Sequence, residues 1–154
     1  DTIHNFGDAA TALPLWAAFT LSRRLPTMRF TYGYGRAEDL AGLLIVAAIL
    51  ASAVLAAYES FNRLGDPPEI DYIWIVVLAA LVGFAGNEAV AIYRTRVGNE
   101  IGSAALIADG HHARADGLTS LTVLFGAIGV WLGYPLADPI VGLVISAAIL
   151  RIVV

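Results

Sequence analysis

The sequence predicts an all-α membrane protein, folded as a multi-helix transmembrane bundle. Of its 154 residues, 58% are hydrophobic and only 14% are charged, whereas about 25% of the residues of a soluble domain are charged. Residues 40–58 and 72–87 carry no charge, and the second stretch has neither helical nor alternating amphipathicity. Segments that are apolar on every side lie in a large core or in lipid, and this chain is too short to form such a core. Because a spanning segment must satisfy its backbone hydrogen bonds internally, the predicted spanning elements are helices.

Five helices are expected, and turn-forming or charged residues separate them. Their ranges are 1–22, 36–62, 72–95, 101–131 and 139–154. The separating segments are, in chain order, SRRLPTMRFTYGYGR, RLGDPPEID, RTRVGNE and GYPLADP. For the last helix, Asp138 is the predicted N-cap and Pro139 the first helical residue. Pro14 is expected to kink the first helix, because proline removes a backbone hydrogen bond.

The arginines predict the orientation of the helices, since the chain contains no lysine. If the helices alternate in direction, one side of the membrane holds Arg23, Arg24, Arg29, Arg36, Arg94, Arg96 and Arg151. Cytoplasmic loops carry an excess of basic residues, so this side is predicted to be cytoplasmic. The first helix and the helix at 101–131 are then antiparallel. TYGYG at 31–35 is interpreted as a glycine-rich turn, because a potassium filter needs four such loops around a pore.

One polar pattern occurs twice in this apolar chain. DTIHNFGDAATAL at 1–13 and DGHHARADGLTSL at 109–121 share D-x-x-H-x-x-x-D-x-x-T-x-L, with starting positions 108 residues apart. Ionisable residues inside a membrane span are costly and indicate a functional site. Repeats of opposite topology that place binding groups near the middle of the membrane are typical of secondary transporters.

The spacing within each repeat predicts a metal site. Residues i and i+4 share a helix face, with Cβ atoms about 5–6 Å apart, so each helix can direct one imidazole and one carboxylate to the same point. Two helices that meet there supply His4, Asp8, His112 and Asp116, a ligand set that suits tetrahedral Zn²⁺. Asp1 and Asp109 lie one turn away on the same faces, where they are expected to accept hydrogen bonds from the imidazoles or to line the access path.

Other charged residues of this region have different predicted roles. His111 lies about 100° around the helix from His112 and is interpreted as a packing or lining residue. Arg114 points away from the predicted ligands and needs an acceptor, for which Glu88 is the candidate in a structural ion pair. The chain has no basic face with interleaved aromatic residues, so nucleic acid is not an expected partner.

These motifs resemble the cation diffusion facilitator family of divalent-metal exporters. The resemblance rests on DTIHNFGD, FTYGYGRAED, ADGHHARAD and ADPIVGLVISAAIL, which together extend over nearly the whole chain. It implies helices two to six of a six-helix domain, a homodimer in the plasma (inner) membrane, and export of metal in exchange for protons. It also implies that His4, Asp8, His112 and Asp116 form the transport site. Members with His and Asp on both helices tend to prefer zinc, and Asp in place of the first His is associated with cadmium acceptance.

The chain also departs from the family pattern. The family's first helix and its cytoplasmic domain have no counterpart here, so residues 1–154 are expected to be the transmembrane transport domain of a longer protein and not to transport alone. The segment PTMRFTYGYG at 26–35 contains no His, Asp, Glu or Cys, so no second metal site is assigned there. The metal itself stays open among Zn²⁺, Co²⁺, Fe²⁺, Mn²⁺ and Cd²⁺, because affinity order alone does not set biological choice.

The residues themselves also support an exchange mechanism, and they leave two other classes open. Histidine must be neutral to bind a metal, so protons compete with the cation for the same nitrogens. A site that opens alternately to each side would then exchange cation for protons. A less favoured alternative is an intramembrane metalloprotease or haem-binding enzyme, but H-E-x-x-H is missing and four protein ligands leave no position for a catalytic water. A purely structural zinc site is the third possibility.

Overall fold

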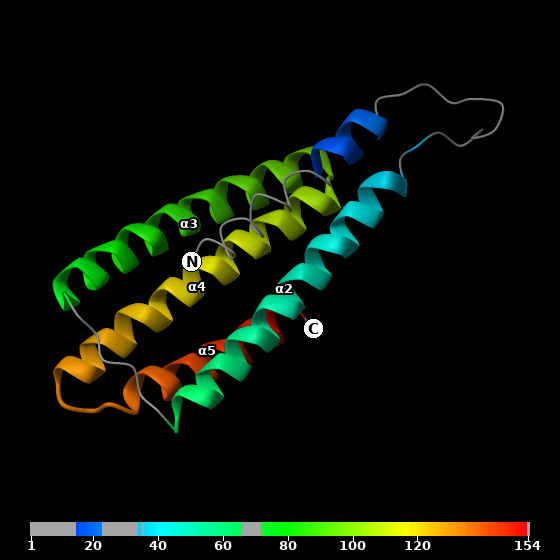
Figure 1. Cartoon of the computed structure of the whole chain (residues 1–154). Helices are drawn as coiled ribbons and strands as arrows, with labels where there is room; N and C mark the ends of the chain where they lie inside the picture. The colour runs from blue at the N-terminus through cyan, green and yellow to red at the C-terminus, as the bar shows by residue number, and fades with distance from the viewer. Residues whose placement is uncertain (1–14, 23–33, 35, 66–71, 154) are drawn as a thin grey trace.

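The computed structural model describes residues 15–22, 34, 36–65 and 72–153, and these residues form a bundle of long helices. Residues 15–22 are helical, and they are followed by the four labelled helices of Figure 1. These are α2 (Arg36–Arg63), α3 (Ile73–Ile101), α4 (Ala104–Trp131) and α5 (Ala137–Val153). The predicted all-α transmembrane bundle is confirmed.

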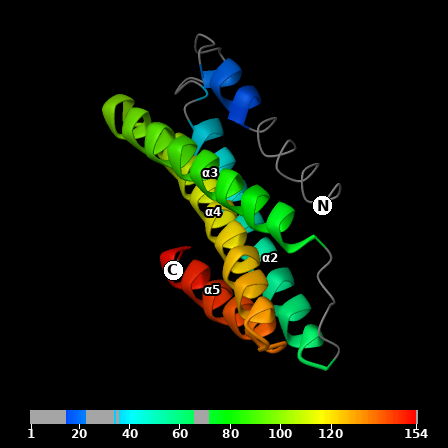
Figure 2. The same cartoon turned by 90° about the vertical axis from the view of Figure 1, so that its left-hand side faces the viewer.

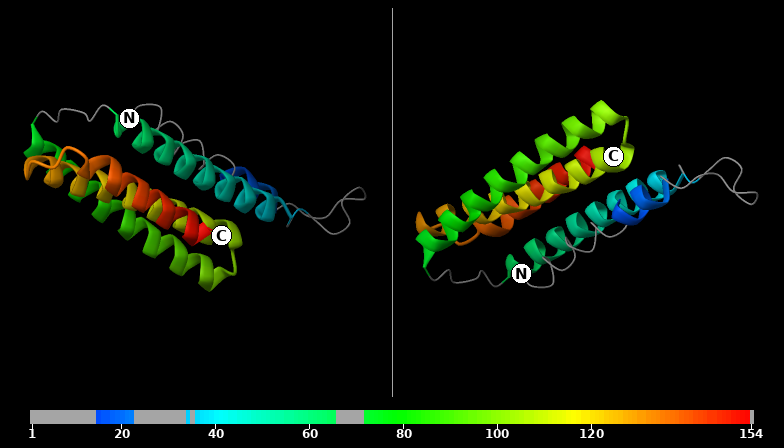
Figure 3. Two further views of the ribbon diagram at one scale, coloured as in Figure 1. Left: turned by 90° about the horizontal axis from the view of Figure 1, so that it is seen from below. Right: turned by 90° about the horizontal axis from the view of Figure 1, so that it is seen from above.

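Helix α4 is the central element of the bundle, because it contacts α2, α3 and α5. α3 and α4 are antiparallel and lie side by side along their full lengths (Figure 2). α2 and the helical segment 15–22 run along one side of the bundle, and α3, α4 and α5 form the other side (Figure 3). The start of α2, the end of α3 and the start of α4 lie at the same end of the molecule, which is the end that the arginine distribution predicts to be cytoplasmic.

Most buried apolar residues among those described are alanines, joined by a few isoleucines, and large apolar residues cover the outside. One buried cluster joins Ile45, Ile49 and Ala53 of α2 to Ala115 of α4 and Ile149 of α5. Side chains that are more than half exposed include Leu43, Leu55, Ile75, Leu78 and Val82. Membrane helices associate through small residues that allow close approach, and α2 and α3 are long and apolar enough to cross a membrane. The surface pattern therefore fits a bundle surrounded by lipid.

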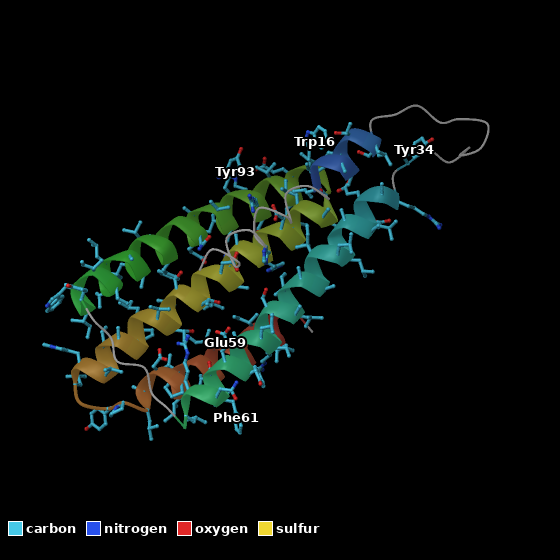
Figure 4. The ribbon with its side chains drawn as sticks, viewed as in Figure 1. Trp16, Tyr34, Glu59, Phe61 and Tyr93 are labelled. Atoms are coloured by element: carbon cyan, nitrogen blue, oxygen red, sulfur yellow. The ribbon has the colours of Figure 1, made fainter. Side chains whose placement is uncertain are left out.

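Aromatic side chains lie toward both ends of the bundle. Trp16 and Tyr93 lie toward one end and Phe61 lies at the other (Figure 4). At that second end, Trp74 and Trp131 pack at 5.9 Å between ring centroids. Tryptophan and tyrosine gather at the two interfaces between membrane and water, so these residues are in positions that fit the boundaries of the lipid.

The predicted boundary between the third and fourth helices is wrong. RTRVGNE at 94–100 was expected to separate them, but α3 continues through it to Ile101 and the chain turns at Gly102. Gly102 has φ 69° and its N–H donates to Gly98 O, a left-handed helix end that glycine adopts without a steric penalty. Ser103 then caps α4, since its Oγ accepts a 3.2 Å hydrogen bond from Leu106 N. Polar residues in the last turns of α3 are compatible with helix because that end of the bundle is exposed.

The predicted N-cap of the last helix is also wrong. α5 begins at Ala137 rather than at residue 139, and Asp138 lies inside its first turn. The Asp138 carboxylate instead accepts a 3.2 Å hydrogen bond from Arg63 Nη1 of α2. A helix end has several free N–H groups, so Pro139 is compatible with this first turn even though it is not the first helical residue.

Candidate metal centre

Helix α4 presents a histidine and a carboxylate on one face inside the bundle. His112 is 4% exposed, and its Nε2 lies 3.9 Å from Asp116 Oδ2, one helical turn further along. This arrangement follows from the helix geometry, since positions i and i+4 are neighbours on the same face. The predicted pairing of imidazole and carboxylate on this helix is therefore present in the structure.

The packing of α4 on two sides positions this face. Toward α3, Gly110 leaves no room for a side chain, because a Cβ there would lie 3.0 Å from Thr95 N and 3.2 Å from Ala91 O. Toward α2 and α5, Ala115 packs in the cluster that contains Ile45 and Ile149. Close packing through small residues on both sides limits the rotation of α4 about its axis. The helix face that carries His112 is therefore held in the interior of the bundle.

The other half of the predicted site lies outside the described residues. Asp1, His4 and Asp8 belong to residues 1–14, so the structure does not test the four-ligand set. Among residues 15–22, 34, 36–65 and 72–153, no group of three or more His, Cys, Asp or Glu side chains could hold a metal ion. His112 and Asp116 are the two predicted ligands that the structure describes.

Asp109 lies one turn before His112, and in the structure it forms an ion pair that the sequence did not predict. Its side chain is 3% exposed, and Oδ2 lies 2.9 Å from Nη1 of Arg94 on α3. From the sequence, Arg94 counted only as a loop charge on the cytoplasmic side. The antiparallel register of α3 and α4 would have revealed the pair, but that register depends on where α3 ends.

The structure contains the ion pair between Arg114 and Glu88 that the sequence suggested. Arg114 donates from Nη2 to Glu88 Oε1 at 2.9 Å and from Nε to Oε2 at 3.3 Å. The two side chains are 36% and 31% exposed. A two-point contact fixes the geometry of both groups, so the pair connects α3 to α4.

His111 is half-buried, and its Nδ1 has no hydrogen-bond partner among the described residues.

A bundle of apolar helices with ionisable groups in its interior defines an integral membrane protein with a polar site between its helices. All 154 residues match the family described as the cation efflux transmembrane domain. The chain belongs to this family of cation transporters, the cation diffusion facilitators.

Similar proteins agree with this assignment. A probable cation efflux system protein of Mycobacterium tuberculosis strain H37Rv is 63% identical over 152 residues, which are 99% of this chain and 46% of that protein. The zinc transporter ZitB of Escherichia coli strain K12 is 28% identical over 98% of this chain and 48% of that protein. The magnetosome protein MamB of Paramagnetospirillum magneticum is 28% identical over 99% and 51%. The chain thus spans about half the length of these relatives.

Proposed function

We propose that the protein exports Zn²⁺ from the cytoplasm in exchange for protons, by alternating access. The observation that carries this proposal is the pair formed on α4 by the buried His112 and the partly buried Asp116, in a chain of the cation efflux family. Placing ionisable side chains inside a membrane domain costs free energy, and such residues mark the pathways of ions and substrates. A cation that is carried across the membrane would meet such a pair on its path.

The proposed site takes its remaining ligands from the first helix, His4 and Asp8. Ala18 packs with Ala41 of α2 and Ala105 of α4, so the segment 15–22 lies against the beginning of α4. Asp8 precedes Ala18 by ten residues, and Asp116 follows Ala105 by eleven. If the helix continues upstream of residue 15 and antiparallel to α4, Asp8 reaches the level of Asp116, because both helices rise about 1.5 Å per residue.

Zinc is the preferred substrate because of the chemistry of this ligand set. Two imidazole nitrogens and two carboxylate oxygens suit four-coordinate Zn²⁺, and the two negative charges balance the charge of the ion where the dielectric is low. Co²⁺, Fe²⁺ and Mn²⁺ can use the same ligands, so transport of one of these ions is the second candidate within the same family. The name of the relative ZitB describes a zinc transporter, which favours zinc among these ions.

Exchange for protons follows from the need for a neutral histidine. A proton on an imidazole nitrogen removes the lone pair that binds the metal, so protonation of His112 from the opposite side would release the ion. We further propose that the protein works as a homodimer in the plasma membrane, as the family resemblance implies.

Flux measurements in proteoliposomes test the proposed function. The full-length protein that contains this chain is reconstituted, a pH gradient is imposed, and Zn²⁺ entry is followed with an internal fluorescent indicator. We expect flux that depends on the gradient and that is lost in His112→Ala and Asp116→Ala, because three ligands hold the ion poorly. Ser120→Ala is the matched control, since Ser120 lies on the same helix and its hydroxyl donates to the backbone carbonyl of Asp116 rather than to the carboxylate. Flux near the unmodified level in either ligand variant would contradict the site.

A further inference from the structure

Three ionisable residues of α4 form a line that leads from the cytoplasmic end of the helix into the bundle. Asp109, His112 and Asp116 occupy positions i, i+3 and i+7, which share one helix face. Asp109 is nearest to the start of α4, about 4.5 Å along the axis before His112 at 1.5 Å per residue. A cation that moves from the cytoplasmic end toward His112 along this face would therefore meet the Asp109 carboxylate first.

Asp109 forms an ion pair with Arg94, and the two side chains differ in burial. The Asp109 side chain is 3% exposed, whereas Arg94, at 2.9 Å, is 38% exposed. The carboxylate is thus held inside the bundle, while the guanidinium reaches it from the exposed side. By contrast, the partners of the Arg114–Glu88 pair are almost equally exposed and share two hydrogen bonds. The two arginines are almost equally exposed, at 38% and 36%, so the pairs differ in the carboxylate, which is 3% exposed in Asp109 and 31% exposed in Glu88.

The close contact between α3 and α4 places Arg94 at this position. Gly110 follows Asp109 directly and lies against the backbone of Thr95, which follows Arg94. Nearer the helix ends, Gly98 lies against Ile107, where a Cβ would be 3.0 Å from the Ile107 N. These two glycine contacts hold the helices in one register, which places Arg94 opposite Asp109.

We propose that Asp109 is a transient divalent-cation site on the cytoplasmic approach to His112 and Asp116, and that Arg94 competes with the cation for it. The inference rests on the proposed transport function and adds a step before the transport site. With no cation present, Arg94 neutralises the buried carboxylate. An arriving Zn²⁺ displaces the guanidinium toward solvent, binds Asp109, and then moves one turn inward to His112. When the ion has passed, Arg94 returns to the carboxylate.

The test compares the zinc concentration dependence of transport in variants of the two residues. Initial rates of Zn²⁺ uptake from the cytoplasmic face are measured in proteoliposomes, and KM and kcat are determined separately. Arg94→Gln removes the competing cation, so KM should fall about threefold, as expected for loss of one partly exposed charge interaction. Asp109→Asn leaves the Arg94 charge without its carboxylate, so KM should rise about tenfold. Arg94→Lys retains the charge and should keep KM near that of the unmodified protein.

The exposed pair of Arg96 and Glu100 supplies a matched control on the same end of α3. Its atoms lie 3.0 Å apart, and its side chains are 78% and 61% exposed. Arg96→Gln therefore removes the same charge from the same surface without touching Asp109, and its KM should not change. This comparison separates competition for Asp109 from a general change in surface potential.

A structural role for the pair makes the opposite prediction. If Arg94 only connects α3 to α4, Arg94→Gln would lower stability and kcat and would not lower KM. The exchanged pair Arg94→Asp with Asp109→Arg retains the connection but places a guanidinium one turn from His112, so we expect KM to rise.

An unchanged or raised KM in Arg94→Gln, or normal transport by the exchanged pair, would overturn the inference. If Arg94→Gln does not fold, a KM for Asp109→Asn equal to that of Arg96→Gln would overturn it instead. Absence of Zn²⁺ flux in the unmodified protein would refute the proposed function itself, and this inference with it.

Discussion

A single methyl group at Gly110 should weaken the contact that positions the site. Gly110 lies at a close contact between α4 and α3, between Asp109 and the proposed ligand His112 in the sequence. A Cβ at this position would lie 3.0 Å from Thr95 N and 3.2 Å from Ala91 O, and it would also overlap Thr95 Oγ1. Thr95 Oγ1 can rotate away, but the two backbone atoms cannot. Gly110→Ala therefore forces the two helices apart.

The size of this effect can be estimated from the contact distances. Carbon atoms make favourable contacts at about 3.5–4.0 Å, so α3 must withdraw by about 0.5 Å. Overpacking of this kind costs about 1–3 kcal/mol. Alanine also favours helix over glycine by about 1 kcal/mol, which partly hides the loss. Comparison with a glycine whose Cβ meets nothing removes this second contribution.

Gly86 of α3 is that matched control, because a Cβ there has no atom within 4 Å. We expect Gly110→Ala to lower the melting temperature of the purified protein by about 4–8 °C relative to Gly86→Ala, from about 2 kcal/mol at 2–4 °C per kcal/mol. Tryptophan fluorescence during heating measures the transition, since Trp74 and Trp131 lie at the far ends of the same two helices. Melting temperatures that agree within about 2 °C would refute the close-contact reasoning.

Three further predictions concern individual side chains. His111→Ala should leave most zinc flux intact while His112→Ala abolishes it, and equal losses would show that the wrong histidine was assigned. Glu88→Gln should lower the melting temperature, because it leaves the partly exposed Arg114 without its two-point hydrogen bond to a carboxylate. Addition of Arg114→Gln should recover part of the loss, and a double variant no more stable than the single one would contradict this. His4→Asp should increase cadmium transport relative to zinc, which competition between the two ions in the flux assay measures; this expectation comes from the family resemblance, and unchanged selectivity would count against it.

Local sequence patterns predicted the two residues of the proposed site that lie on one helix. His112 and Asp116 share a face of α4 because of the helix repeat alone, so their 3.9 Å approach needed no tertiary information. The Arg114–Glu88 pair was suggested because a charge in an apolar helix requires a partner, and only one acidic residue lay in the middle of the neighbouring predicted helix. His4 and Asp8 lie outside the described residues, so the complete ligand set is still a prediction.

Composition and periodicity determined the class of protein, the approximate position of each helix and the residues of α4 that face the site, because these properties depend on interactions within one helix or with lipid. The tertiary structure decided what depends on contacts between helices. RTRVGNE continues α3, and its Gly98 packs against Ile107 of α4. Asp138 lies inside α5 with its carboxylate directed to Arg63. The register of two antiparallel helices likewise pairs Arg94 with Asp109. Charges near a helix end look alike in the sequence, and only the neighbouring helix determines whether such a charge lies in solvent or against a buried carboxylate.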